Sequence, residues 1–170
     1  MCATPGGTGA IRNTIANYSD IGDSILTTDW FWGPYNTISQ EIGRKLATYQ
    51  MFDSDNNYNL AALEEKAEEL TQKQGSLVIL LNTPAHNPTG YSLNDDEWDR
   101  LIDILNKLTA TDKKITLFID AAYIDFAGDE DRYRSFLPKL SKLNKNVLPI
   151  IGYSASKTLT MYGMTLWQLR

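Results

Sequence analysis

Two largely apolar segments constrain the fold of this chain more than any other feature of its sequence. Residues 77–81 read Leu-Val-Ile-Leu-Leu, and residues 115–119 read Ile-Thr-Leu-Phe-Ile. Such strands are typical of a parallel sheet that helices cover on both faces. Helical patterns alternate with strand patterns along the chain, the clearest being an amphipathic helix over residues 93–108. The sequence therefore predicts an α/β fold, a three-layer α/β/α arrangement with a mostly parallel sheet.

The remaining elements are predicted from the same periodicities and from capping residues. Asn59 is expected to cap one helix, and Asn94 with Glu97 forms an asparagine version of the capping box for another. Further strands are predicted at residues 24–28, 49–53 and 147–153, and further helices at residues 11–18, 34–47, 60–74 and, more briefly, 133–139.

Charge and composition exclude several classes of function. The chain has 16 basic and 21 acidic residues, and this net charge of −5 argues against a nucleic-acid-binding face. Its single cysteine, Cys2, excludes an internal disulfide and fits a reducing compartment. No apolar run approaches the roughly 20 residues of a membrane span, and the first residues lack a signal pattern. We therefore expect a cytoplasmic protein with neither nucleic-acid nor membrane partners.

Polar residues follow the two apolar segments, at the end of the strands where open α/β sheets bind ligands. Asn87 lies in an Asn-Pro-Thr-Gly sequence, which would form a tight turn in any fold. Asp120 ends the second segment and Tyr123 follows it. Its carboxylate either caps the next loop or meets a positively charged atom of a ligand. His86, the only histidine, is expected to be a hydrogen-bonded structural residue.

Three further segments could contribute to a site. Residues 5–10 read Pro-Gly-Gly-Thr-Gly-Ala and precede a helix, which favours either a phosphate at the helix N-terminus or a loop that needs positive φ. Residues 29–35 hold four aromatic side chains, which are core anchors or include a stacking platform for a flat ring. Lys157 follows the last strand; it is either a solvated turn residue or an amine that acts as nucleophile and proton carrier.

Taken in order, these segments resemble the pyridoxal-phosphate-dependent enzymes of aminotransferase fold type I, class I/II, across nearly all of the chain. The resemblance implies an aminotransferase, which transfers an amino group between an amino acid and a 2-oxo acid through lysine-bound pyridoxal phosphate. A lyase or other chemistry at the α-carbon would use the same residues. A non-catalytic binding or regulatory domain, or an inactive fragment, is the alternative.

The resemblance also implies catalytic roles for particular residues. Lys157 would be the Schiff-base lysine, which also carries the proton between the substrate Cα and the cofactor. Asp120 would pair with the protonated pyridine nitrogen, and so support the ring as an electron sink. Tyr123 and Asn87 would hydrogen-bond the phenolic oxygen of the ring.

The other implied roles concern cofactor binding alone. Gly7, Thr8 and Ser154 would hold the phosphate. Trp32, which lies next to a glycine, would stack on the ring face, and Trp30 is the second candidate for that position. No metal site is expected.

The chain departs from the family pattern near its end and in its length. The family has a phosphate-binding arginine where this chain has Thr165, which offers a hydroxyl without charge, and Trp167 replaces a usual glycine. Residues 1–170 are interpreted as part of a cofactor-binding large domain, truncated at both ends and without the small domain. We expect the full-length protein to be a homodimer. Exposed apolar edges of the truncated sheet predict instability or association.

Overall fold

The computed structural model describes residues 2–161 and the backbone of residues 166–169. The strands are β1 (Cys2–Pro5), β2 (Ser24–Thr28), β3 (Lys45–Tyr49), β4 (Ser76–Asn82), β5 (Lys114–Asp120), β6 (Val147–Ser154) and β7 (Leu166–Leu169). The helices are α1 (Gly6–Tyr18), α2 (Pro34–Glu41), α3 (Leu60–Lys73), α4 (Asp95–Leu108), α5 (Glu130–Arg134), α6 (Phe136–Lys139) and α7 (Ala155–Thr158), with 3-10 turns η1 (Ile124–Phe126) and η2 (Leu140–Lys142).

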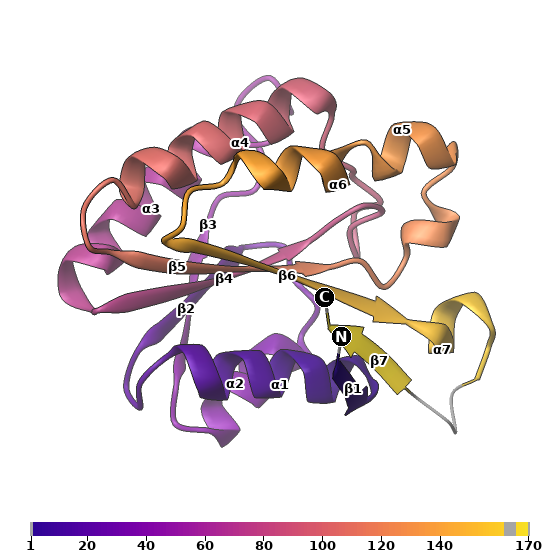
Figure 1. The fold of residues 1–170 in the computed structure, drawn as a ribbon, viewed down its shortest axis with the longest axis horizontal. Coiled ribbons are helices and arrows are strands. Elements are labelled where there is room, and N and C mark those ends of the chain that lie inside the picture. Colours follow the sequence, from indigo (N-terminus) through magenta and orange to yellow (C-terminus); the bar gives the residue numbers. More distant parts are fainter. Residues whose placement is uncertain (1, 162–165, 170) are drawn as a thin grey trace.

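The sheet lies between two layers of helices, as Figure 1 shows. Helices α1 and α2 cover one face, whereas α3, α4 and α6 cover the other. Strands β3, β2, β4, β5 and β6 are parallel neighbours in that order. Strand β7 pairs antiparallel with β6, and β1 pairs antiparallel with β7. The predicted three-layer α/β/α fold with a mostly parallel sheet is therefore confirmed.

Side-chain alternation in the central strands divides the core into two clusters. In β4, Leu77, Ile79 and Leu81 pack in the cluster that includes α3 and α4. Val78 and Leu80 pack in the cluster that includes α1 and α2. Because both faces of the strand are buried, nearly every position must be apolar, which explains the segment that predicted the sheet.

Strand register brings three chain positions to one edge of the sheet. Asn82 at the end of β4 lies opposite Asp120 at the end of β5, and Asp120 lies opposite Gly152 in β6. The carboxyl ends of these parallel strands therefore present their following loops at one place, which is where such sheets bind ligands.

The predicted helix over residues 34–47 was wrong in its second half. Helix α2 ends at Glu41, and Gly43 adopts a φ of +76°, which a side chain would strain. The chain then forms β3 at Lys45–Tyr49, so the strand predicted at 49–53 begins four residues too late. The apolar spacing after residue 41 fitted a helix, but parallel pairing with β2 overrides it.

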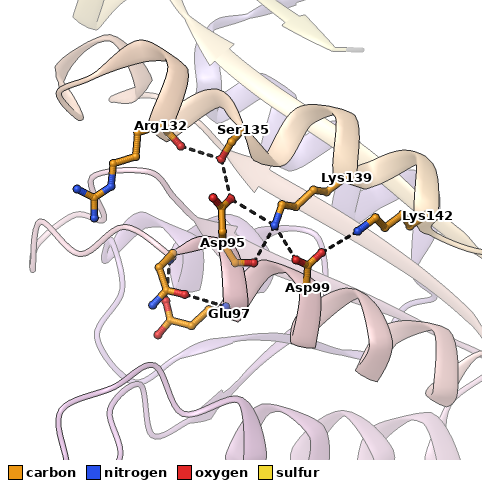
Figure 2. Close-up of polar contacts among 8 residues, drawn as sticks. Asp95, Glu97, Asp99, Arg132, Ser135, Lys139 and Lys142 are labelled. Carbon is orange, nitrogen blue, oxygen red and sulfur yellow. Dashed lines mark hydrogen bonds and ion pairs between the residues drawn. The ribbon is translucent and has the colours of Figure 1, made fainter.

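Helix α4 is fixed at its start and along one side by polar contacts, several of which are drawn in Figure 2. The predicted capping box is confirmed, because Asn94 Oδ1 accepts from the Glu97 N–H at 2.9 Å and Glu97 Oε2 accepts from the Asn94 N–H at 2.8 Å. Lys139 of α6 binds Asp99 at 2.7 Å and Asp95 at 3.3 Å, so it joins α6 to α4. In the part of the chain that is described, no helix is both long and apolar enough to cross a membrane.

Candidate functional site

A cavity of about 290 Å³ lies at the carboxyl ends of β4, β5 and β6. The start of α1 and the aromatic loop before α2 complete its wall. Eight residues that the sequence singled out for a site line this cavity, namely Gly7, Thr8, Trp32, Asn87, Asp120, Tyr123, Ser154 and Lys157. The structure thus brings together residues spread over most of the chain, while their individual chemical roles stay predictions.

Asp120 is a buried acid, and one of its carboxylate oxygens has no hydrogen-bond donor among the described residues. Asp120 is 6% exposed. Tyr35 is fully buried, and its hydroxyl donates a hydrogen bond to Asp120 Oδ2 at 2.5 Å. No described residue hydrogen-bonds Asp120 Oδ1. Burial raises the pKa of Asp120 to about 6, against opposing effects of the Tyr35 hydroxyl, the Ala122 N–H and the Lys157 charge. A buried carboxylate oxygen without a donor favours a cationic partner in the cavity.

Lys157 lies on the short helix α7, where the sequence predicted a loop. Ser154 ends β6 and caps α7, because its Oγ accepts from the Ser156 N–H at 3.2 Å. The Lys157 Nζ lies 5.5 Å from the centroid of the Tyr123 ring. Lys157 and Asp120 both line the cavity, and the Lys157 charge lowers the pKa of Asp120.

The glycine-rich segment both turns the chain and begins α1. Gly6 has a φ of +70°, so the positive φ expected for this segment is confirmed. Helix α1 starts there, with Gly7 and Thr8 in its first turn and no side-chain cap from Pro5. The first N–H groups of a helix have no partner within it, and its dipole is positive at that end. Phosphate binding at this turn stays a prediction.

Trp32 and Trp30 occupy different environments. Trp32 lines the cavity and meets the Tyr35 ring edge-to-face, with 5.7 Å between centroids. Trp30 is 55% exposed and lies outside the residues that line the cavity, so the structure does not favour it as the stacking residue.

His86 is held inside the loop after β4. Its residue is 4% exposed, and its Nδ1 lies 2.9 Å from Thr89 Oγ1. Burial lowers the pKa of His86 to about 4, although a hydrogen bond with the Trp30 backbone opposes this. A neutral, hydrogen-bonded imidazole agrees with the structural role predicted for it.

A family model described as aminotransferase class I and II matches residues 2–166 of this sequence. The chain belongs to the class I and II aminotransferase family. Its sequence is 30% identical over 166 residues to an aromatic-amino-acid aminotransferase of Pseudomonas aeruginosa, covering 94% of this chain and 38% of that protein.

Solved aminotransferase structures share the fold. A crystal structure of an aminotransferase from Anaerococcus prevotii has a TM-score of 0.95 and 42% identity, covering 98% of this chain and 41% of that one. An aromatic-amino-acid aminotransferase from Burkholderia pseudomallei, solved covalently bound to pyridoxal phosphate, has a TM-score of 0.73 and 21% identity, covering 99% and 40%. The chain thus spans about two fifths of the length of these aminotransferases.

Three residues in or beside this cavity were missed by sequence reasoning. Tyr35 was one of several aromatic residues in its loop, and nothing marked it as the partner of Asp120. Asn82 donates Nδ2–H to the Asp120 backbone carbonyl at 2.8 Å and accepts from the Asn87 N–H at 2.6 Å, so it joins two loops of the site. Its place at the end of β4 was the only available signal. Ser156 lines the cavity with a buried Oγ that no described residue hydrogen-bonds.

The side chains of the two residues that depart from the family pattern lie outside the described part of the chain. Thr165 lies outside the described residues, and only the backbone of Trp167, within β7, is described.

Proposed function

We propose that this chain is the cofactor-binding part of an aminotransferase, which transfers an amino group between an amino acid and a 2-oxo acid with pyridoxal phosphate held on Lys157. The observation that carries the proposal is the meeting of Asp120 and Lys157 in the lining of one cavity, with the buried Asp120 Oδ1 lacking a hydrogen-bond donor among the described residues. Few common biological ligands combine a cationic ring nitrogen for such an oxygen with an aldehyde for an amine. Pyridoxal phosphate offers both.

The other polar groups of the cavity fit the same molecule. The start of α1 and the hydroxyls of Ser154 and Ser156 offer donors that suit a phosphate group. Asn87 and Tyr123 can donate hydrogen bonds to the phenolic oxygen of the ring. These donors come from different loops, so a ligand with charged groups at separate positions would satisfy them together.

Individual residues of this chain would then have separate roles in the reaction. Bound pyridoxal phosphate supplies an aldehyde carbon that bonds to amines and a ring that withdraws electrons from the substrate Cα. Asp120 would accept a hydrogen bond from the ring nitrogen and favour its protonated form. Once the substrate amine has displaced it, the free Lys157 amine would take the proton from the substrate Cα and deliver it to the former aldehyde carbon. Trp32 lines the cavity, where its indole would shield one side of the bound ring from water.

The relatives suggest which amino donors to try. Matched proteins include an aromatic-amino-acid aminotransferase of Pseudomonas aeruginosa and a mitochondrial aspartate aminotransferase of Gallus gallus. We therefore propose an amino acid and its 2-oxo acid as the substrates, with aromatic and acidic amino acids as the first donors to test.

The visible absorbance of pyridoxal phosphate mixed with the chain tests the proposal. We expect a protein-bound absorbance band that is lost in Lys157→Ala. Lys145→Ala is the matched control, because Lys145 lines a separate hollow near the amino end of β5 and should not affect the band. A band that survives in Lys157→Ala would refute the assignment of the lysine.

A second measurement separates catalysis from binding alone. After cofactor loading and removal of excess, an amino donor is added and the 2-oxo acid released in one turnover is quantified. Stoichiometric release supports an aminotransferase, whereas an absorbance band without release supports the binding-domain alternative.

A further inference from the structure

Asp125 connects three elements around the lysine segment. It lies in the turn η1, two residues after Tyr123. Its Oδ1 accepts from Arg134 Nη2 at 2.6 Å. Its Oδ2 accepts from the Tyr153 hydroxyl at 2.8 Å and from the Thr158 hydroxyl. The hydroxyls of Tyr153 and Thr158 also lie 3.1 Å apart, so these groups form one network.

This network brackets the helix that carries Lys157. Tyr153 precedes α7 and Thr158 is its last residue, so both ends of the segment bind the same carboxylate. A helix of four residues is not stable by itself, and its position must come from tertiary contacts. Asp125 provides such a contact at the end of α7 opposite the Ser154 cap.

The same carboxylate also links α7 to the loop that carries Tyr123. Because η1 follows Tyr123 directly, moving Asp125 would shift that ring relative to the Lys157 amine, which lies 5.5 Å from its centroid. We propose that Asp125 is a positioning residue, which holds α7 against the Tyr123 loop so that the Lys157 amine keeps its place in the cavity when it exchanges partners.

The charge of Asp125 suits this role. Its side chain is 21% exposed, and Arg134 is 34% exposed. Burial opposes ionisation of Asp125, but the Thr158 and Tyr153 hydroxyls and the Arg134 charge outweigh it and hold the pKa below its usual value. An ionised carboxylate only accepts hydrogen bonds, so it can satisfy all three donors at once. In asparagine an NH2 group replaces one carboxylate oxygen, and this group cannot accept a hydrogen bond from any of the three donors.

The inference rests on the proposed function, and its test uses four variants. Asp125→Asn and Thr158→Val weaken the network, whereas Thr158→Ser keeps the hydroxyl. Glu130→Gln is the matched control, because Glu130 is the other carboxylate bound to Arg134, at 2.9 Å, and lies outside the network. Melting temperatures establish that each variant is folded before comparison.

The first measurement is the rate at which pyridoxal phosphate attaches to Lys157, trapped by borohydride and mapped by mass spectrometry. We expect attachment to slow by about tenfold in Asp125→Asn and Thr158→Val. Thr158→Ser and Glu130→Gln should react like the parent chain. Unchanged rates in Asp125→Asn and Thr158→Val would overturn the inference, as would an equal loss in Thr158→Ser.

The second measurement does not need the cofactor. Acetic anhydride labelling of the cofactor-free chain reports access to the Lys157 amine, with Lys145 as internal reference. We expect Lys157 labelling to rise by about threefold or more in Asp125→Asn, because α7 loses a tether and opens more often. Labelling equal to the parent chain would overturn the inference. If the parent chain never attaches pyridoxal phosphate, the proposed function fails while this measurement still decides the role of Asp125.

Discussion

Tyr35→Phe removes one hydroxyl from the buried Asp120 carboxylate and leaves the aromatic ring in the core. Asp120 in the folded chain has a pKa of about 6, above the usual 3.8, because it is buried. The folded state therefore binds more protons than the unfolded state between these two values. Stability is greatest below about pH 4 with respect to this group and falls as pH rises to about 6. Because the Tyr35 hydroxyl lowers the pKa of Asp120, its removal should raise this pKa. The loss of stability with rising pH should then extend to higher pH.

The size of the effect follows from the charge on the acceptor. A hydrogen bond to a charged group contributes about 1.5–3 kcal/mol, against about 0.5–1.5 kcal/mol for a neutral pair. Tyr35→Phe should therefore cost about 1–2 kcal/mol more at pH 8, where Asp120 is ionised, than at pH 4.5. This difference corresponds to a rise of about one unit in the Asp120 pKa.

Urea unfolding of the cofactor-free chain at several pH values measures this difference. Tyr49→Phe is the matched control, because the buried Tyr49 hydroxyl pairs with the Tyr58 hydroxyl at 2.5 Å. Burial raises the pKa of both tyrosines well above this pH range, so the cost of Tyr49→Phe should be constant. An equal cost of Tyr35→Phe at both pH values would show that its hydroxyl does not stabilise an ionised Asp120.

Three other substitutions test local features. Asn82→Ala removes the bonds to the Asn87 and Asp120 loops and should lower the urea unfolding free energy by about 2–4 kcal/mol. In Gly9→Ala the new Cβ would lie 2.8 Å from the ring of Pro5. Alanine has the better helix propensity, but this overlap should outweigh it, so calorimetry should show a net loss of stability of about 1 kcal/mol or more. Lys139→Met breaks the two ion pairs that Lys139 makes with Asp95 and Asp99 in Figure 2, and should lower the melting temperature at low salt, with a smaller difference at high salt.

Features of the fold that depend on neighbouring residues were predictable from the sequence. The Asn94 capping box joins residues three apart, and the strand at residues 24–28 has the predicted bounds. Apolar periodicity identified α3 and α4 because each packs one face on the sheet. The boundary between α2 and β3 was not predictable in this way, since pairing with β2 decides it.

Local sequence patterns could not predict contacts between residues that lie far apart in the chain. Tyr35 and Asp120 are 85 positions apart, and no periodicity or spacing relates them. The antiparallel pairing of β1 with β7 joins the two ends of the described chain and had no local signal. The sequence could predict that the site residues lie together for two reasons. Parallel strands end at a common edge, and the order of these residues along the chain resembles that of a known family. The resemblance supplied chemical roles that no spacing alone provides.

The two helix layers that cover the sheet contribute unequally to the cavity. Phe118 packs with α1 and α2, and the alternation of β5 places Asp120 on that same side, where Ile11 and Ala122 also line the cavity. Helices α3, α4 and α6 contribute none of its described lining. Substitutions on the outer surfaces of those three helices, including ones chosen to make the chain more stable, should therefore leave the cavity lining unchanged.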